Sequence, residues 1–133
     1  PAPGLARLDA LAAGARQAGL PVTVRVQGEP RATSAVTDLA AFRVIQEALT
    51  NTVRHAGPAT ATVTVAYGPD GLRVEVTDDG TGGAPNGGAP AADSPAAGHG
   101  IRGMRERAAA AGGTIEAGPM APRGFRVAAW FPC

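Results

Sequence analysis

The sequence of 133 residues has no lysine, one cysteine, one tryptophan, one tyrosine and no long run of apolar residues. The single Cys133 cannot form an internal disulfide, and no segment is long and apolar enough to span a bilayer. The net charge of +1 gives no general attraction for nucleic acid or for a membrane surface. We therefore expect a cytosolic domain that contacts neither, and that holds any anionic ligand by local geometry.

The residues that are present are enough for one domain with one core, because an apolar content of 44% is ordinary for a globular protein. All basic residues are arginine, which with much Ala, Gly and Pro suggests a GC-rich genome more than a function. The chain begins at Pro1 without a methionine or a signal peptide. This beginning favours a fragment of a longer protein, whose other parts could include a membrane sensor.

Hydrophobic periodicity predicts alternating helices and strands, most of them ended by glycine or proline. The order helix, strand, helix, two strands, loop, helix, two strands predicts a two-layer α/β sandwich, with helices on one face of a mixed sheet. We expect helices at residues 5–18, about 34–56 and 101–111, and strands at 22–27, 60–68, 71–79, 114–118 and 124–131.

The middle helix is predicted to begin at a cap formed by Thr33 or Ser34, with Asp38 near the first turn. One continuous apolar stripe is expected to face the core. Its members are Leu39, Phe42, Ile45, Leu49, Thr52, Val53 and Ala56.

The other side of this helix carries Glu47, Asn51 and His55, which advance by four residues and so line up, with Arg54 beside them. Amide and carboxylate oxygens suit a Mg²⁺ ion, which shares its ligands with substrate phosphates. Arg54 and His55 can donate hydrogen bonds to phosphate, and Glu47 can orient a water or accept a proton. A plain solvated helix face is the alternative.

The segment VTDDGTGG, residues 76–83, places two carboxylates at the end of a strand and glycines directly after them. Gly80 and Gly82 let the backbone turn sharply and approach a ligand closely. A plain turn or a calcium loop is the alternative. A calcium loop of the EF-hand type needs a Glu twelve positions on, and Ala89 and Pro90 stand near there instead.

The segment GHGIRGMRERA, residues 98–108, is a glycine cluster that opens a helix after a Gly/Ala/Pro loop. Its Gly98, Gly100 and Gly103 would let backbone N–H groups approach phosphates. A dinucleotide-binding site is the alternative, with Glu116 near the expected distance for a ribose-binding acid. That motif directly follows a strand in a βαβ unit, and no strand precedes the glycines here.

In this order and spacing the segment 43–56, VTDDGTGG and GHGIRGMRERA resemble the N, G1 and G2 boxes of the GHKL or Bergerat ATP-binding fold. Histidine kinases and gyrase-type ATPases share this fold. Over residues 20–132 the chain looks most like bacterial sensor histidine kinases that pair with NarL-type response regulators. The short loop without a Phe, between Gly82 and Gly98, agrees with that subfamily.

The resemblance implies that the chain binds ATP and Mg²⁺, with Asn51 as the metal ligand, helped by Glu47. Asp78 would accept a hydrogen bond from the adenine amino group, and Glu47 would be the catalytic base. Residues 1–20 would form a connector helix within the same domain, and 21–133 the ATP-binding body with a lid at about 83–98. The nucleotide-binding residues would be Asn51, Arg54, His55, Asp78, Gly80, Gly82, Gly98, His99, Gly100, Ile101 and Gly103.

The family transfers phosphate to a histidine on a helical dimerisation domain. The only histidines here, His55 and His99, lie inside nucleotide-binding motifs. The resemblance therefore implies an upstream dimerisation and phosphoacceptor domain, a NarL-type response regulator as partner, and a monomeric fragment that does not phosphorylate itself. The intact protein could be anchored in the cell membrane. The alternatives are an anti-sigma-factor serine kinase of the same fold and a degenerate domain that binds partners without nucleotide.

Overall fold

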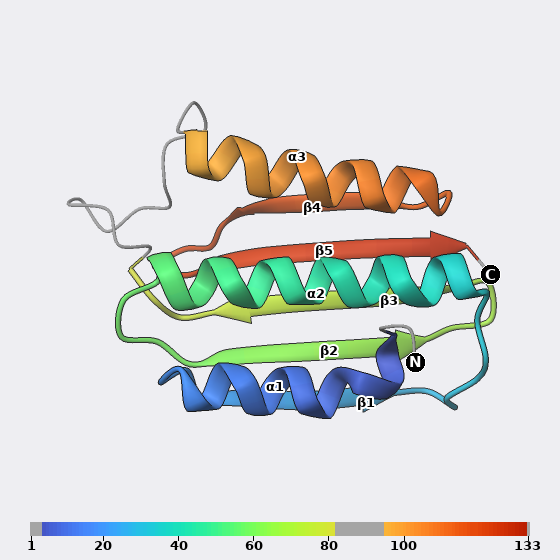
Figure 1. The fold of residues 1–133 in the computed structure, drawn as a ribbon, viewed down its shortest axis with the longest axis horizontal. Coiled ribbons are helices and arrows are strands. Elements are labelled where there is room, and N and C mark those ends of the chain that lie inside the picture. The colour runs from blue at the N-terminus through green and yellow to red at the C-terminus, as the bar shows by residue number, and fades with distance from the viewer. Residues whose placement is uncertain (1–3, 82–94, 133) are drawn as a thin grey trace.

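The computed structural model describes residues 4–81 and 95–132, with side chains from Ile101 onward in the second range. The described residues form three α-helices and five strands, which follow one another in the predicted order (Figure 1). A 3₁₀ turn, Leu5–Arg7, leads into α1. The elements are α1 (Leu8–Gln17), β1 (Val22–Gln27), α2 (Ala35–His55), β2 (Ala61–Tyr67), β3 (Gly71–Asp78), α3 (Pro95–Ala110), β4 (Thr114–Pro119) and β5 (Phe125–Pro132).

The strands form one mixed sheet in the order β1-β2-β3-β5-β4. β1 runs parallel to β2, and the other neighbouring pairs are antiparallel. The three helices lie side by side across one face of this sheet, with α2 in the middle (Figure 1). The predicted two-layer α/β sandwich with helices on one face is confirmed.

The core lies between the helices and the sheet, because alternate strand residues point to the helical side. Val63 and Val65 of β2 and Leu72 and Val74 of β3 are almost completely buried. Phe131 of β5 is fully buried in the same cluster. The strand alternation seen in the sequence therefore marks the face that the helices cover.

The helix α2 begins where the sequence predicted, since the Oγ of Ser34 accepts a hydrogen bond from the backbone N–H of Thr37 at 3.1 Å. Its predicted apolar stripe is wrong at two positions. Leu39 and Val53 are 38% and 41% exposed, and small residues take their place in the core. α2 lies on the sheet between α1 and α3. The side of α2 that faces the sheet contains Ala41 and Ala48, which are one heptad apart and almost completely buried.

The helix α3 begins at Pro95, six residues before the predicted start. Proline is favoured in the first turn of a helix, where its missing N–H is not needed, and Ala96 and Ala97 are strong helix formers. The glycines at 98 and 100 therefore lie in helical backbone, and the end of the predicted lid, residues 95–98, belongs to α3. The rest of that lid lies outside the described residues.

The face of the sheet opposite the helices is mostly polar, although Trp130 is 43% exposed on it. The carboxylate of Glu75 accepts hydrogen bonds from Arg73 at 2.6 Å and from Arg126 of the neighbouring strand at 2.9 Å. Such exposed pairs are worth little in stability, but they keep this face compatible with water. No helix in the described part of the chain is long and apolar enough to cross a bilayer.

Candidate functional site

The carboxylate of Asp78 is the one buried charged group among the described residues, with 7% of the residue exposed. Asp78 is the last residue of β3, and its side chain points to the helical face of the sheet. Its Oδ1 accepts a hydrogen bond from the backbone N–H of Gly80 at 2.9 Å. Its Oδ2 lies 3.4 Å from the Oγ1 of Thr52 in α2, which donates to it.

Burial raises the pKa of Asp78 above the ordinary value of 3.8, because removal from water disfavours the charged form. The hydrogen bonds from Gly80 and Thr52 act in the opposite direction, and the negative charge of Asp79 adds slightly to the increase. A buried acceptor with free lone pairs can recognise a donor on a ligand and reject a ligand that offers another acceptor.

The adjacent Asp79 has the opposite environment. It is exposed, and its carboxylate accepts two hydrogen bonds from Thr60, one from the backbone N–H at 2.6 Å and one from the hydroxyl at 2.9 Å. These two bonds lower the pKa of Asp79. Asp79 thus ties the end of β3 to the connection that precedes β2, and its carboxylate is already occupied by protein donors.

The turn after Asp78 packs against the end of α2. Thr81 donates its backbone N–H to the carbonyl of Ala56 at 2.9 Å. A Cβ atom on Gly80 would lie 2.3 Å from that carbonyl oxygen and 2.7 Å from the Ala56 Cβ. Gly80 is therefore required for a close approach of two backbones, which places Asp78 beneath the last turns of α2. The structure gives Gly80 this packing role, and its predicted nucleotide contact stays a prediction.

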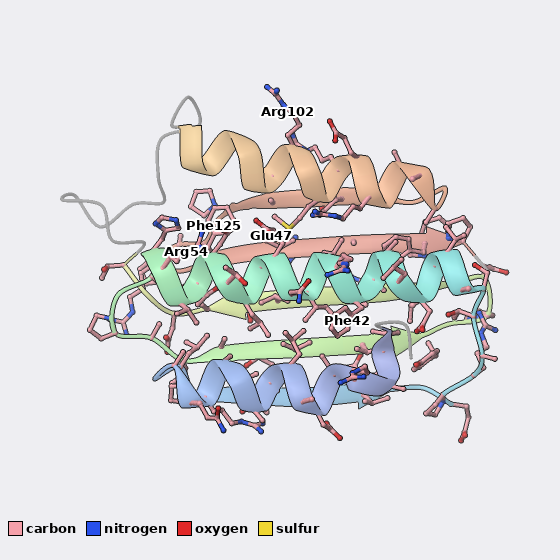
Figure 2. All side chains as sticks on the ribbon, in the orientation of Figure 1. Phe42, Glu47, Arg54, Arg102 and Phe125 are labelled. Carbon is pink, nitrogen blue, oxygen red and sulfur yellow. The ribbon has the colours of Figure 1, made fainter. Side chains whose placement is uncertain are left out.

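Asn51 directly precedes Thr52 in α2, so it lies about 100° around the helix from the residue that contacts Asp78. Glu47 lies on the side of α2 that faces α3, and Arg54 lies near the C-terminal end of the helix (Figure 2). Glu47, Asn51 and His55 are half-buried and Arg54 is exposed. Among the described side chains, those of residues 4–81 and 101–132, none forms a hydrogen bond or ion pair with the side chains of these four residues.

The donor set on this face fits a Mg²⁺ ion held mainly by a ligand and water. Asn51 and Glu47 offer oxygen atoms, which Mg²⁺ prefers, and the ion usually takes only one or two protein ligands. The described residues contain no group of three His, Cys, Asp or Glu side chains that could hold a metal by themselves.

The third predicted motif is described only in part. Ile101 is half-buried and packs against the core, so its side chain has a structural task. Gly103 lies in the same helix, where a Cβ would come 3.4 Å from the side chain of Arg107. Gly98, His99 and Gly100 lie in the first turns of α3. Gly82 lies outside the described residues.

Two neighbours of Asp78 were not singled out as site residues from the sequence. Thr52 was assigned to the apolar stripe, although it is a buried polar residue next to Asn51. Phe125 is paired with Asp78 across β3 and β5, so the ring and the carboxylate share the helical face of the sheet. Phe125 is half-buried and adds an apolar wall beside the carboxylate. Only the strand register reveals this pairing.

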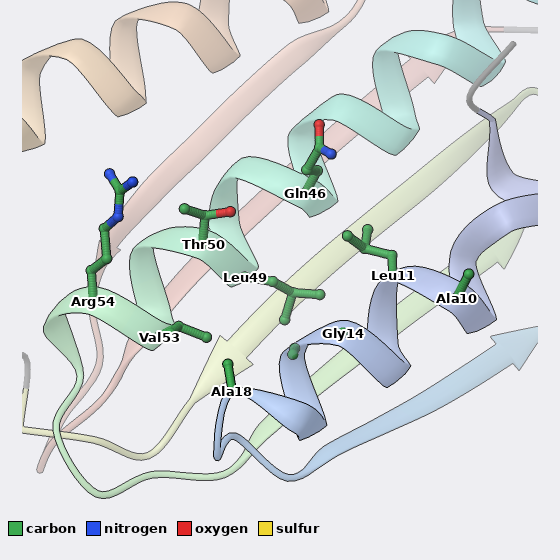
Figure 3. Close-up of a pocket in the computed structure, with 10 residues that line it drawn as sticks. Ala10, Leu11, Gly14, Ala18, Gln46, Leu49, Thr50, Val53 and Arg54 are labelled. Atoms are coloured by element: carbon green, nitrogen blue, oxygen red, sulfur yellow. The ribbon is translucent and has the colours of Figure 1, made fainter.

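A separate groove of about 350 Å³ lies between α1 and α2 (Figure 3). Its lining is mostly small or apolar, and includes Leu11, Gly14, Leu49 and Val53. The guanidinium group of Arg54 points away from the α1 side of this groove (Figure 3). Arg54 also lines the groove, but neither Asp78 nor Asn51 does, so the groove shares only this residue with the candidate site.

The comparisons with known proteins agree with this geometry. The family described as "Histidine kinase-, DNA gyrase B-, and HSP90-like ATPase" matches residues 36–133. This match covers well over half of the chain and includes all three motifs, so the chain belongs to this ATPase family. The family predicted from the motifs is thereby confirmed. Pairing with a NarL-type regulator stays a prediction.

Two similar proteins are sensor histidine kinases of Bacillus subtilis. YxjM of Bacillus subtilis is 36% identical over 86 residues, which are 65% of this chain and 19% of that protein. LnrJ of the same organism is 34% identical over 116 residues, which are 87% of this chain and 27% of that protein. The chain thus spans about a quarter or less of these relatives.

A solved structure also shares the fold. The histidine kinase domain of the Erythrobacter litoralis EL346 blue-light activated kinase superposes with a TM-score of 0.73. It is 24% identical, and the match covers 96% of this chain and 63% of that one. At this identity the likeness supports the fold alone, and it confirms the α/β sandwich that the periodicity predicted.

Proposed function

We propose that this chain is the ATP-binding catalytic domain of a two-component sensor histidine kinase. It presents Mg-ATP to a histidine on a separate dimerisation domain, and residues 1–20 connect the two. The single observation that supports this most strongly is the buried carboxylate of Asp78 beneath α2, where it contacts Thr52, the residue after Asn51, in a chain of this ATPase family. A NarL-type response regulator is the proposed final partner.

Each site residue has a proposed task that its chemistry allows. Asp78 accepts the amino group of adenine, and Asn51, aided by Glu47, supplies oxygen atoms to Mg²⁺. The ion would neutralise charge on the phosphate groups when bound. Arg54, His55 and His99 bind phosphate oxygens, and Gly98, Gly100 and Gly103 let the phosphates approach α3 closely because they have no Cβ. Glu47 orients or deprotonates the accepting group, so catalysis rests on positioning, without a covalent intermediate on this domain.

Calorimetric titration of ADP and GDP, each with and without Mg²⁺, tests the nucleotide part of the proposal. We expect ADP to bind, and more tightly with Mg²⁺. GDP should not bind, because its carbonyl would face the Asp78 carboxylate. Absence of ADP binding by the folded chain under all these conditions would contradict the proposal and favour a partner-binding domain without nucleotide.

Phosphoryl transfer is tested by mixing this chain with labelled Mg-ATP, alone and with the dimerisation domain of the intact protein. We expect label on that domain and none on this chain. An anti-sigma-factor serine kinase of the same fold would bind ADP equally well but would leave the dimerisation domain unlabelled. The ADP titration therefore cannot distinguish a histidine kinase from such a serine kinase, whereas the phosphoryl-transfer assay can.

A further inference from the structure

Thr52 is a buried polar residue in the core-facing side of α2, with 7% of its surface exposed. Its Oγ1 lies 2.9 Å from the backbone carbonyl of Ala48 one turn earlier, and its single proton is shared between this carbonyl and the Asp78 carboxylate. This bond to the i−4 carbonyl selects one rotamer of the threonine. The hydroxyl oxygen is thereby held at a defined place on the underside of the helix.

From that place Thr52 reaches the sheet. The Oγ1 lies 3.4 Å from Oδ2 of Asp78, which is 26 residues away in the sequence. The other oxygen, Oδ1, is held at 2.9 Å by the backbone N–H of Gly80. The two contacts act on different oxygens, so together they restrict rotation of the carboxylate about its last bond. An ionised carboxylate has about four lone-pair directions, and the two contacts leave others open.

We infer that Thr52 is a positioning residue for adenine recognition, because its hydroxyl orients the Asp78 carboxylate so that an open lone pair faces the amino group of the base. The inference rests on the proposed role of Asp78 and adds a residue to it. A purely structural role would need only an apolar side chain here, since α2 already packs through Ala48 and Leu49. Burying a hydroxyl has a free-energy cost that its hydrogen bonds must offset.

The test measures how much the adenine amino group contributes to binding. ADP and purine riboside diphosphate, which lacks that amino group, are titrated calorimetrically into the wild-type chain and into Thr52→Val. Valine has nearly the same shape but no hydroxyl. We expect the preference for ADP to fall about three- to tenfold in Thr52→Val, while the affinity for purine riboside diphosphate stays within about twofold.

Three further variants make the result specific. Thr52→Ser keeps the hydroxyl and should retain the wild-type preference for ADP. Thr52→Ala also lacks the hydroxyl, and gives the same comparison if valine prevents folding. Thr37→Val removes another buried threonine hydroxyl of α2, 4% exposed and in the first turn of the helix, and should leave the preference unchanged.

The outcomes separate the inference from the proposed function. If the wild-type chain prefers ADP and both Thr52→Val and Thr52→Ala keep that preference, the inference about Thr52 is wrong and the role of Asp78 stands. A wild-type chain that binds both nucleotides equally overturns the adenine contact itself, and the inference with it. Loss of the preference in Thr37→Val as well would show a general effect of helix stability and would also overturn the inference.

Discussion

Asp78 and Asp79 are consecutive residues, yet Asp78 is buried beneath α2 and Asp79 is exposed, with its carboxylate bonded to Thr60. The alternation of side chains at the end of β3 turns one carboxylate to the helical face and leaves the other at the surface. Substitutions of the two acids can therefore be compared directly. The Asp78 carboxylate has open lone pairs in the candidate site, whereas the Asp79 carboxylate is bonded to the loop residue Thr60.

Asp78→Asn is expected to weaken ADP binding by about ten- to a hundredfold, the worth of one hydrogen bond to a charged group. The amide oxygen would stay with the Gly80 N–H, and the NH₂ group would then face the adenine amino group, donor against donor. Calorimetric titration measures the change. Asp79→Asn is the control, and should lower the thermal midpoint slightly while leaving ADP affinity within about twofold. Equal losses of affinity in both variants would contradict the assignment.

The raised pKa of Asp78 makes stability depend on pH in a defined direction. Between 3.8 and the raised value the folded chain binds more protons than the unfolded chain, so the contribution of Asp78 to stability falls as pH rises through this window. Asp79 has a lowered pKa, so its contribution is present above 3.8 and is lost only as pH falls below it. Urea unfolding of the wild type and Asp78→Asn at several pH values measures the difference.

We expect the unfolding free energy of the wild type, relative to Asp78→Asn, to decrease as pH rises above 3.8. ADP affinity should change the other way, because only the ionised carboxylate is a full acceptor for the adenine amino group. A stability difference that does not vary with pH would show that burial does not shift the titration of Asp78.

Gly80→Ala is expected to destabilise the chain by about 1–3 kcal/mol, because its Cβ would clash with backbone atoms of Ala56 that cannot easily move. Gly14→Ala is the control, since no atom lies within 4 Å of a Cβ at that position in α1. Alanine should stabilise the helix there by about 0.5–1 kcal/mol. Chemical denaturation of both variants checks the two opposite signs, and a stable Gly80→Ala would contradict the packing role.

Asn51→Ala is expected to remove the effect of Mg²⁺ on nucleotide binding. The wild type should bind ADP about tenfold more tightly with Mg²⁺, and the variant equally with and without the ion. Thr50→Ala is the control, because Thr50 is the preceding residue of α2 and lines the groove on the α1 side. A variant of Asn51 that keeps the full Mg²⁺ effect would assign the metal to other ligands.

Most local features followed from the sequence by itself. The strand at 22–27 was predicted residue for residue, and Ser34 was one of two candidate caps for α2. Both depend on interactions within a few residues, namely side-chain alternation and a hydrogen bond between neighbours in the chain. The polar face of Glu47, Asn51 and His55 was equally visible, because a helical period places them on one side.

Features that depend on distant segments were decided only by the tertiary structure. The sequence could not show that β1 lies parallel to β2, that Phe125 pairs with Asp78, or that Thr52 reaches the Asp78 carboxylate. It also assigned Val53 to the buried stripe, whereas packing between α1 and α3 set the rotation of α2. Periodicity determines which residues share a face, but only the contact of helix, sheet and neighbouring helices determines which face is buried and what it meets there.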